Sequence, residues 1–338
     1  MDLDKIFLKD ACPTSVGGQA VMEGIMMRGV ERSAIAVRVP DGRIHMKTYP
    51  NKKLGKWAKV PLIRGVVSFV SSLVQGTSTL MYSADVLEEY WTDEEAYEPD
   101  KMEEWLNKKF GEKGTWNIMM YISVIIAIAF SVGIFILLPT VVVNWADGFI
   151  KSPVLLNLLE GIVRLLLFGI YVVLISKMED IKRVFQYHGA EHKTIHCFEK
   201  NLELTPENAQ QFYTLHPRCG TSFLVFVMVI SLILFSLLGW PNLFWRITSR
   251  LLLLPVVAGL SYEVLKWAGR SDHWLVKALS IPGLYMQKLT TNEPDESQLE
   301  VAIAAVKAVM VPAETPFFEG ICDLEGRLVE EHKIERGN

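Results

Sequence analysis

Long blocks of apolar residues without any charge constrain the fold of this chain more than any other feature. Residues 117–143 and residues 221–239 contain no Asp, Glu, Lys or Arg. A helix of about 20 apolar residues crosses the roughly 30 Å hydrocarbon core of a bilayer. Residues 154–175 and 251–267 are also long enough, although each stretch carries charged side chains. The sequence therefore predicts an α-helical multi-pass membrane protein with about four transmembrane helices.

Lysine and arginine residues predict the orientation of these helices, because short loops rich in them stay in the cytoplasm. Basic residues cluster before the first predicted span, after the second and after the fourth, whereas the connections 144–153 and 240–246 hold few. Both termini are therefore expected on the cytoplasmic side of the inner membrane. All four cysteines then lie on the reducing side, where free or metal-bound thiols are expected rather than disulfides.

Outside the apolar blocks, the chain is expected to form a small α+β subdomain in the cytoplasm. Residues 34–39 and 43–49 alternate between apolar and polar side chains around Pro40-Asp41-Gly42, a pattern typical of a β-hairpin. This hairpin is assigned to an N-terminal subdomain of residues 1–59. Near the other end of the chain, residues 296–310 have the apolar spacing of an amphipathic helix.

Residues 60–86 are apolar with a helical period, but polar residues and glycines such as Arg64 and Gly76 interrupt them. Basic residues precede the segment, so the charge rule disfavours a crossing. An interfacial or re-entrant helix is predicted, with a fifth span as the alternative. The predicted division is residues 1–59, 60–115 for this helix and a charged linker, 116–175 for two spans, 176–220 for a His/Cys-rich segment, 221–268 for two spans, and 269–338 for a cytoplasmic C-terminal segment.

The His/Cys-rich segment carries the strongest chemical signal, the run YHGAEHKTIHC at residues 187–197. In a helix, His188 and His192 lie one turn apart on one face, a geometry in which two imidazoles bind one metal ion. Glu191 completes the H-x-x-E-H order of the inverted zinc peptidases, in which the glutamate accepts a proton from water. His196 lies a further turn on and drifts around the helix, so one ion is not expected to bind all three histidines.

The remaining ligands are open to alternatives. Glu263 is the expected third ligand, because it lies near the cytoplasmic end of the fourth predicted span. A competing site uses His216 and Cys219, with His196 or Cys197 as further ligands, and four such ligands make a closed structural site. In a third interpretation no ion binds, and the histidines only form hydrogen bonds with neighbouring groups.

Glu160 and Arg164 form a separate feature within the second predicted span. They are spaced i, i+4 with the acid first, the favourable order on a helix. Ionisable residues at this depth usually face a bundle interior or a cavity. We expect a neutralised pair that fixes the helix register, and the alternative is a polar element of a substrate or ion path.

Four stretches of the sequence resemble the YqhQ-like family, a domain-of-unknown-function family of bacterial membrane proteins. They are RVFQYHGAEHKTIHCFE (183–199), HPRCGTSFL (216–224), LLLLPVVAGLSYEVLK (251–266) and GGQAVMEGIMMRG (17–29). Members are sometimes labelled predicted metal-dependent enzymes. The resemblance implies a membrane protein with a metal site and brings no substrate.

Two functions follow from these features. The first is a metal-dependent hydrolase at the cytoplasmic face, with zinc as the divalent metal, Glu191 as the base and a peptide or lipid-derived substrate. The second is a non-enzymatic membrane scaffold or assembly factor whose His/Cys cluster is structural. The bilayer is one expected partner and a membrane or cytoplasmic protein another. No nucleic acid is expected, and the oligomeric state is left open.

Overall fold

The computed structural model describes residues 6–7, 12, 14–52, 55, 60–90, 101–239, 241–268 and 274–331. Residues 91–100 of the predicted charged linker lie outside the described residues, as do 332–338. The chain forms two compact units. The first unit comprises Met1–Trp91, Val172–Ile230 and Pro255–Asn338, and the second comprises Thr92–Tyr171 and Ser231–Leu254.

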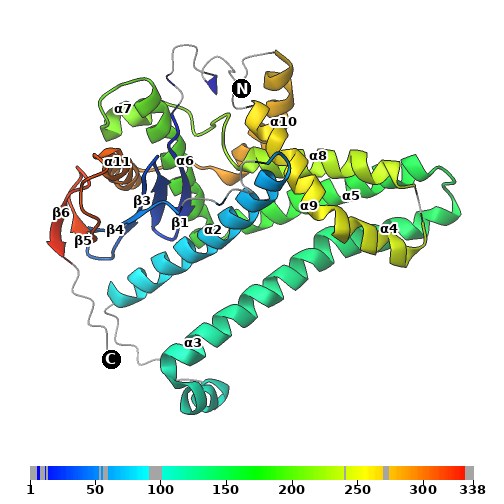
Figure 1. Cartoon of the computed structure of the whole chain (residues 1–338), viewed down its shortest axis with the longest axis horizontal. Coiled ribbons are helices and arrows are strands. Elements are labelled where there is room, and N and C mark those ends of the chain that lie inside the picture. The colour runs from blue at the N-terminus through cyan, green and yellow to red at the C-terminus, as the bar shows by residue number, and fades with distance from the viewer. Residues whose placement is uncertain are drawn as a thin grey trace. The chain divides into compact units, whose positions relative to one another are not determined.

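The first unit contains a six-stranded antiparallel sheet with the strand order β1-β2-β3-β4-β5-β6 (Figure 1). The predicted hairpin is confirmed by the pairing of β3 with β4, which runs from Arg32 opposite Pro50 to Arg38 opposite Ile44. Gly42 lies in the connecting turn with a φ of 87°, a conformation that glycine adopts readily. The strands are β1 (Gly17–Val21), β2 (Gly24–Arg28), β3 (Arg32–Arg38), β4 (Ile44–Pro50), β5 (Glu319–Cys322) and β6 (Leu328–Glu331).

The sheet extends beyond the N-terminal 59 residues, because β5 and β6 come from the C-terminal part of the chain. His45 of β4 lies opposite Ile321 of β5, and Ile321 lies opposite Glu330 of β6. Neither strand is evident from the sequence. Each has only four residues, and all four side chains of β6 are exposed, so no apolar alternation marks it.

Helices cover both faces of the sheet. Ile25 and Met27 pack in one core with α6 (Glu179–Glu199) and α11 (Glu296–Met310), the predicted amphipathic helix. Met26 packs in a second core with Val86 of α2 (Ile63–Tyr90). Successive side chains of a strand point to opposite faces, which explains why neighbours along β2 belong to different cores. Part of the helix predicted near residues 60–86 therefore packs on the sheet (Figure 1).

Three helices of the described chain are long and apolar enough to cross a membrane, Ile118–Gly148, Pro153–Ile175 and Leu243–Trp267. This corrects the predicted count of about four. The expected third span is α8 (Thr221–Leu237), whose 17 residues reach only about 25 Å at 1.5 Å per residue. The remaining helices are α3 (Lys101–Val132), which continues through Gly133–Leu137 into α4 (Leu138–Asn144) and a short turn (Trp145–Gly148), then α5 (Pro153–Ile175), α7 (Pro206–Gln210), α9 (Leu243–Ala268) and α10 (Trp274–Thr290).

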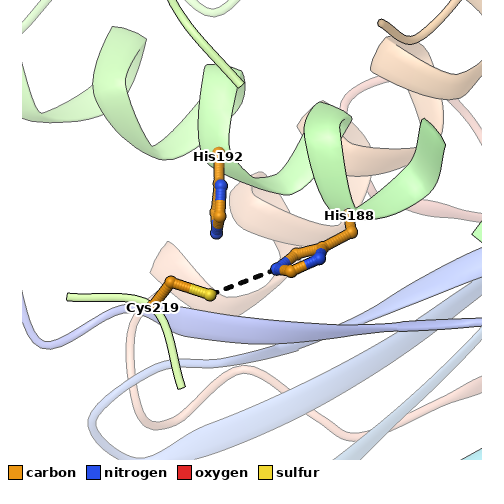
Figure 2. A group of neighbouring side chains, drawn as sticks. All are labelled: His188, His192 and Cys219. Carbon is orange, nitrogen blue, oxygen red and sulfur yellow. Dashed lines mark hydrogen bonds between the residues drawn. The ribbon is translucent and has the colours of Figure 1, made fainter. Parts of the chain in front are cut away.

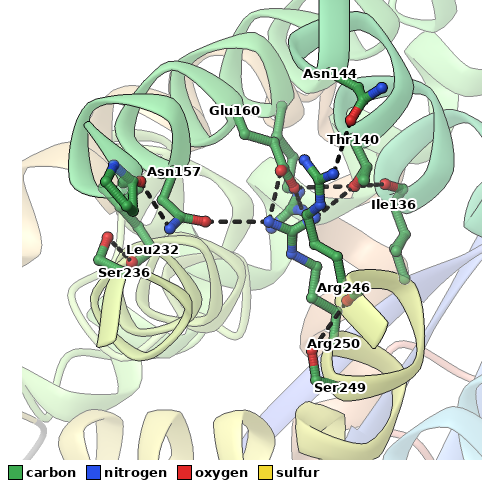
Figure 3. Close-up of polar contacts among 12 residues, drawn as sticks. Ile136, Thr140, Asn144, Asn157, Glu160, Leu232, Ser236, Arg246, Ser249 and Arg250 are labelled. Atoms are coloured by element: carbon green, nitrogen blue, oxygen red, sulfur yellow. Dashed lines mark hydrogen bonds and ion pairs between the residues drawn. The ribbon is translucent and has the colours of Figure 1, made fainter. Parts of the chain in front are cut away.

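The Glu160–Arg164 pair forms in the second unit. Arg250, an arginine that the sequence analysis did not consider, also contacts Glu160 (Figure 3). Glu160 Oε1 accepts a hydrogen bond from Arg164 Nη2 at 2.9 Å, and Glu160 Oε2 lies 2.6 Å from Arg250 Nη2 on α9. Glu160 is 2 % exposed and Arg250 3 %. One buried carboxylate therefore links α5 with α9.

Neutral side chains complete this polar cluster. Thr140 of α4 donates to Glu160 at 3.1 Å and accepts from Arg250 Nη1 at 2.8 Å. Arg250 Nη2 also donates to Asn157 at 3.1 Å, and Arg246 Nη2 donates to Asn144 at 2.8 Å. Three helices of the second unit are thus held by one hydrogen-bonded network, which agrees with the structural interpretation of the pair.

Candidate metal centre

The predicted helix at the histidine motif is α6, and it presents His188 and His192 one turn apart. Their rings are 4.5 Å apart between centroids. Cys219, which follows α7 in the chain, points toward both rings (Figure 2). One nitrogen from each imidazole and the Cys219 sulfur all lie within 4.8 Å of one another, and His188 Nε2 is 3.3 Å from that sulfur. Two imidazoles and a thiolate are a donor set that zinc prefers.

Backbone carbonyls hold both imidazoles in place from behind. His188 Nδ1 donates to the Thr290 carbonyl at 2.8 Å, and His192 Nδ1 donates to the Thr214 carbonyl. A carbonyl can only accept, so Nδ1 carries a hydrogen in both rings, and in a neutral ring Nε2 then keeps its lone pair. This is the arrangement that orients metal-binding histidines in proteins. Burial also lowers the pKa of His192, so the ring is neutral at pH 7.

Gly189 lets α6 approach the segment that holds His188. A Cβ at this position would lie 2.1 Å from the Asn292 carbonyl oxygen. The Asn292 N–H in turn donates to the Phe185 carbonyl at 2.9 Å. Any larger residue at position 189 would push α6 away from residues 290–292, and so away from the Thr290 carbonyl that fixes His188.

Glu191 lies beside the histidines against strand β1. Its Oε1 accepts a hydrogen bond from the Gly18 N–H at 2.9 Å. Burial raises the pKa of Glu191, and the nearby His188 and the Gly18 hydrogen bond lower it in part. His188, Glu191, His192 and Cys219 all line a cavity of about 460 Å³. The group therefore faces space that a small ligand can enter.

The sequence comparisons agree with the resemblance noted above. Residues 60–311 match the family described as "Protein of unknown function (DUF1385)". The chain belongs to this family. The chain is 35 % identical over 310 residues to "Uncharacterized protein YqhQ" of Bacillus subtilis (strain 168). This alignment covers 89 % of the chain and 94 % of that protein. No solved structure matches. The match covers the histidine motif, Cys219 and Glu263, so the whole candidate centre except the β1 contact lies within the DUF1385 region.

Glu263, the third ligand expected from the sequence, lies outside this group. Its carboxylate forms an ion pair with Arg64 of α2 instead. Glycines on the two helices permit this contact, since a Cβ on Gly65 would lie 2.8 Å from the Gly259 Cα. The close packing of α2 on α9 directs Glu263 to the start of α2. Cys219, predicted for the competing site, joins His188 and His192 in its place.

The closed four-ligand site is not assembled among the described residues. Cys197 donates to the Glu203 carbonyl, and burial raises the pKa of its thiol to about 11. His196 Nε2 donates to the Leu215 carbonyl at 3.0 Å, and burial lowers the pKa of His196 to about 4. His216 also lines the cavity, but it contacts Glu199 and the His196 ring. These residues fit the interpretation in which histidines only form hydrogen bonds.

Glu199 organises this second set of contacts, and sequence reasoning missed it. It lies 3.7 Å from His216 Nε2, accepts from the Thr14 N–H at 2.9 Å and forms an ion pair with Arg218. Burial alone would raise the pKa of Glu199, but the bonds from His216 and Thr14 and the charge of Arg218 lower it to about 2. The carboxylate therefore stays ionised and ties residue 14 to the segment that carries Cys219. The only sequence feature that pointed to these contacts was the HPRCG run, which contains Arg218.

Proposed function

We propose that this protein is a metal-dependent hydrolase whose centre is formed by His188, His192 and Cys219, with zinc as the preferred ion. One observation supports the proposal above the others. One nitrogen of each imidazole and the Cys219 sulfur lie within 4.8 Å of one another, while backbone carbonyls take both Nδ1 hydrogens. The ring nitrogen of His188 that faces the cavity contacts only a thiol, at 3.3 Å, and an ion can replace this weak hydrogen bond.

The donor set fits a catalytic rather than a structural ion. Structural zinc sites use four protein ligands, whereas catalytic sites use three and leave a fourth position for water or substrate. Three donors converge here, and they line the 460 Å³ cavity. A divalent ion at such a site supplies Lewis acidity and makes water acidic enough to lose a proton near neutral pH.

Glu191 is the residue proposed to move that proton. It lines the same cavity, and the Gly18 N–H fixes one carboxylate oxygen at 2.9 Å. A carboxylate whose pKa is raised by burial is a stronger base than an exposed one and suits general acid–base catalysis near pH 7. Under this proposal Glu191 accepts a proton from water and then donates it to the leaving group.

The proposed setting is the cytoplasmic face of a membrane. Three helices have the length and composition to cross it, and the basic flanks favour a cytoplasmic position for the sheet and the histidine helix. The proposed reaction is hydrolysis of an amide or ester in a peptide or lipid-derived substrate. A scaffold with a structural ion is the competing outcome in the tests below.

The first test measures metal bound by the full chain purified in detergent. We expect about one zinc per chain, and near-complete loss in His188→Ala, His192→Ala and Cys219→Ser, because each removes one of three donors. Cys12→Ser is the matched control, since Cys12 is exposed and outside the group. Equal metal content in Cys219→Ser and Cys12→Ser would refute the proposed centre.

The second test separates catalysis from structure. Glu191→Gln should keep its zinc and lose hydrolysis of p-nitrophenyl esters and internally quenched peptides by on the order of 100-fold or more. If Glu191→Gln keeps both its metal and full hydrolysis, Glu191 is not the base. If the zinc-loaded wild type hydrolyses neither probe class, the structural interpretation is favoured.

A further inference from the structure

We propose that one face of α2 lies among the acyl chains of the cytoplasmic leaflet, so that this helix is embedded in the membrane surface without crossing the bilayer. The proposal does not depend on the hydrolase function. The face is the α2 stripe, which consists of the exposed aliphatic residues Ile63, Val70, Leu73, Val74 and Leu80. Their spacing places them within one arc of the helix, because 3.6 residues make a turn. A contiguous exposed apolar surface of this kind marks a site of interaction.

The side of α2 away from the stripe faces protein and is largely small or polar. The buried residues of α2 are Gly65, Thr79, Ser83 and Val86, and only the last is aliphatic. Ser83 Oγ accepts a hydrogen bond from the Met22 N–H at 3.2 Å. A helix on the surface of a soluble protein buries its apolar face and exposes its polar face. On α2 the exposed side is instead the aliphatic one, as on a helix that is in contact with lipid.

The start of α2 packs against a helix that is long and apolar enough to cross a membrane, Leu243–Trp267 of α9. Gly259 lies about 12 Å along this helix from its end at Trp267. A Cβ on Gly65 would lie 2.8 Å from the Gly259 Cα, so the two backbones are in close contact. Small residues permit such contacts between membrane helices. With Trp267 at the interface, where tryptophans are enriched, Gly65 lies at the depth of the acyl chains.

The charge pattern of α2 matches a helix that lies in one leaflet. Residues 65–84 contain no charged side chain, and Arg64 before them forms an ion pair with Glu263. The first charges after the stripe are Asp85 and Glu88, which are both exposed. α2 is not among the helices of the described chain that are apolar enough to cross a membrane. An uncharged apolar side on a helix of lower overall hydrophobicity is typical of interfacial helices.

Lipid fits the α2 stripe better than a second protein surface does. All five residues of the stripe are aliphatic, whereas Trp, Tyr and Arg contribute most to the stability of protein interfaces. The opposite side of α2 also connects with the candidate metal centre. Gln19 of β1 donates to the Gly76 carbonyl of α2 at 3.3 Å and lines the cavity of that centre. Embedding of α2 therefore places this cavity beside the surface of the bilayer.

Photocrosslinking of the full chain identifies what covers the stripe. p-Benzoylphenylalanine replaces Val74, which is 66 % exposed, and the protein is reconstituted into nanodiscs of phosphatidylethanolamine and phosphatidylglycerol. We expect irradiation to add the mass of one lipid to the chain. Phe130, an exposed residue of the helix Ile118–Gly148, is the position for the positive control. Glu88, which is exposed beyond the end of the stripe, is the position for the negative control and should give little adduct.

Labelling with a charged maleimide measures the access of water at the same positions. Val74→Cys and Glu88→Cys are made in a Cys12→Ser background, and the labelling of that background is subtracted. Maleimide reacts with the thiolate, which does not form in hydrocarbon. We therefore expect labelling at position 74 to be on the order of tenfold slower than at position 88. Thermal unfolding of each variant shows that it is folded.

A lipid adduct at position 74 together with slow labelling supports the proposal. A crosslink between two chains at position 74 would assign the stripe to a second copy of the protein and overturn it. The proposal is also overturned if position 74 gives no adduct when position 130 gives one, or if position 74 is labelled as fast as position 88. None of these results depends on bound metal, so the hydrolase proposal is tested separately.

Discussion

Each unit of the molecule holds a buried polar cluster, and the two clusters use their hydrogen-bonding groups in opposite ways. In the second unit, Glu160 contacts arginines with both carboxylate oxygens, and Thr140 and Asn157 accept from Arg250. In the first unit, carbonyls satisfy only the outer nitrogens of His188 and His192, and the inner nitrogens meet Cys219 at a cavity.

This difference separates a group that stabilises from a group that binds. A buried cluster whose charged groups are paired with one another joins helices and has little capacity for a ligand. In the first unit a thiol, which is a weak hydrogen-bonding group, lies against His188 Nε2, and an ion can replace that contact. The comparison predicts that mutations in the second unit act on stability, whereas mutations in the first unit act mainly on binding.

The largest expected effect is that of Glu160→Gln. Removing the carboxylate leaves the buried Arg164 and Arg250 without a negative partner. Removing one partner of a buried ion pair lowers the free energy of unfolding by about 3–5 kcal/mol. Unfolding of the detergent-solubilised protein measures the loss. Glu179→Gln, at an exposed position at the start of α6, is the control. A loss no larger than that of the control, or smaller than that of Cys219→Ser in metal-free protein, would break the comparison.

The contribution of each buried imidazole to the pH dependence of the metal-free protein should be the next largest single effect. Burial lowers the pKa of His196 and of His216 to about 4, from an ordinary value of 6.5. Between about pH 6.5 and pH 4 the unfolded chain binds protons that the folded chain does not. Stability is therefore full above pH 6.5 and falls as the pH is lowered through this window, by on the order of 3 kcal/mol for each imidazole.

Urea denaturation at pH 7, 6, 5 and 4 in the presence of a chelator measures this dependence. His216→Gln should flatten the curve, because it removes one of the two groups. A wild-type protein that is equally stable at pH 7 and pH 4.5 would contradict the burial of these rings.

Added zinc should stabilise the wild type by a similar or smaller amount. An ion that binds only the folded state at 100 times its dissociation constant contributes about 2.7 kcal/mol. Glu160→Gln should keep this increment, although its baseline is lower, and Cys219→Ser should lose it. Thermal unfolding with and without zinc makes the comparison, and an increment that survives in Cys219→Ser would place the ion elsewhere.

The smallest expected effect is that of Glu263→Gln. The residue pairs with Arg64 in a partly exposed position and lies outside the His/Cys group, so we expect unchanged zinc content and little change in stability. The zinc content of Glu263→Gln is measured together with that of His188→Ala, which shows how large the loss of a ligand is. Metal loss in Glu263→Gln would restore the ligand set expected from the sequence and reject Cys219.

Local patterns predicted several parts of this protein because their information lies within a few neighbouring residues. The β3–β4 hairpin follows from alternation around a Pro-Asp-Gly turn, and the position of His188 relative to His192 follows from the pitch of α6. Both were predicted from the sequence and are confirmed. The predicted count of about four membrane-crossing helices was wrong, because α8 ends at Leu237 after 17 residues although apolar residues continue.

Contacts between distant segments could not be predicted in the same way. Glu263 and Cys219 were both plausible partners for the histidines, and their spacing in the chain does not decide between them. The choice depends on how α9 packs against α2 through Gly65 and Gly259, which turns Glu263 toward Arg64. The same holds for Arg250, whose partner Glu160 is 90 residues away.

The sequence alone determined the apolar helices, the hairpin, the helical histidine motif and membership of the family, because hydrophobic runs, turn residues and one-turn spacings act locally. Only the tertiary structure decided the rest: the third donor at the histidines, the addition of β5 and β6 to the sheet, and the position of β1 at the cavity. These features depend on which surfaces bury one another, and that is a property of the packed chain rather than of any segment.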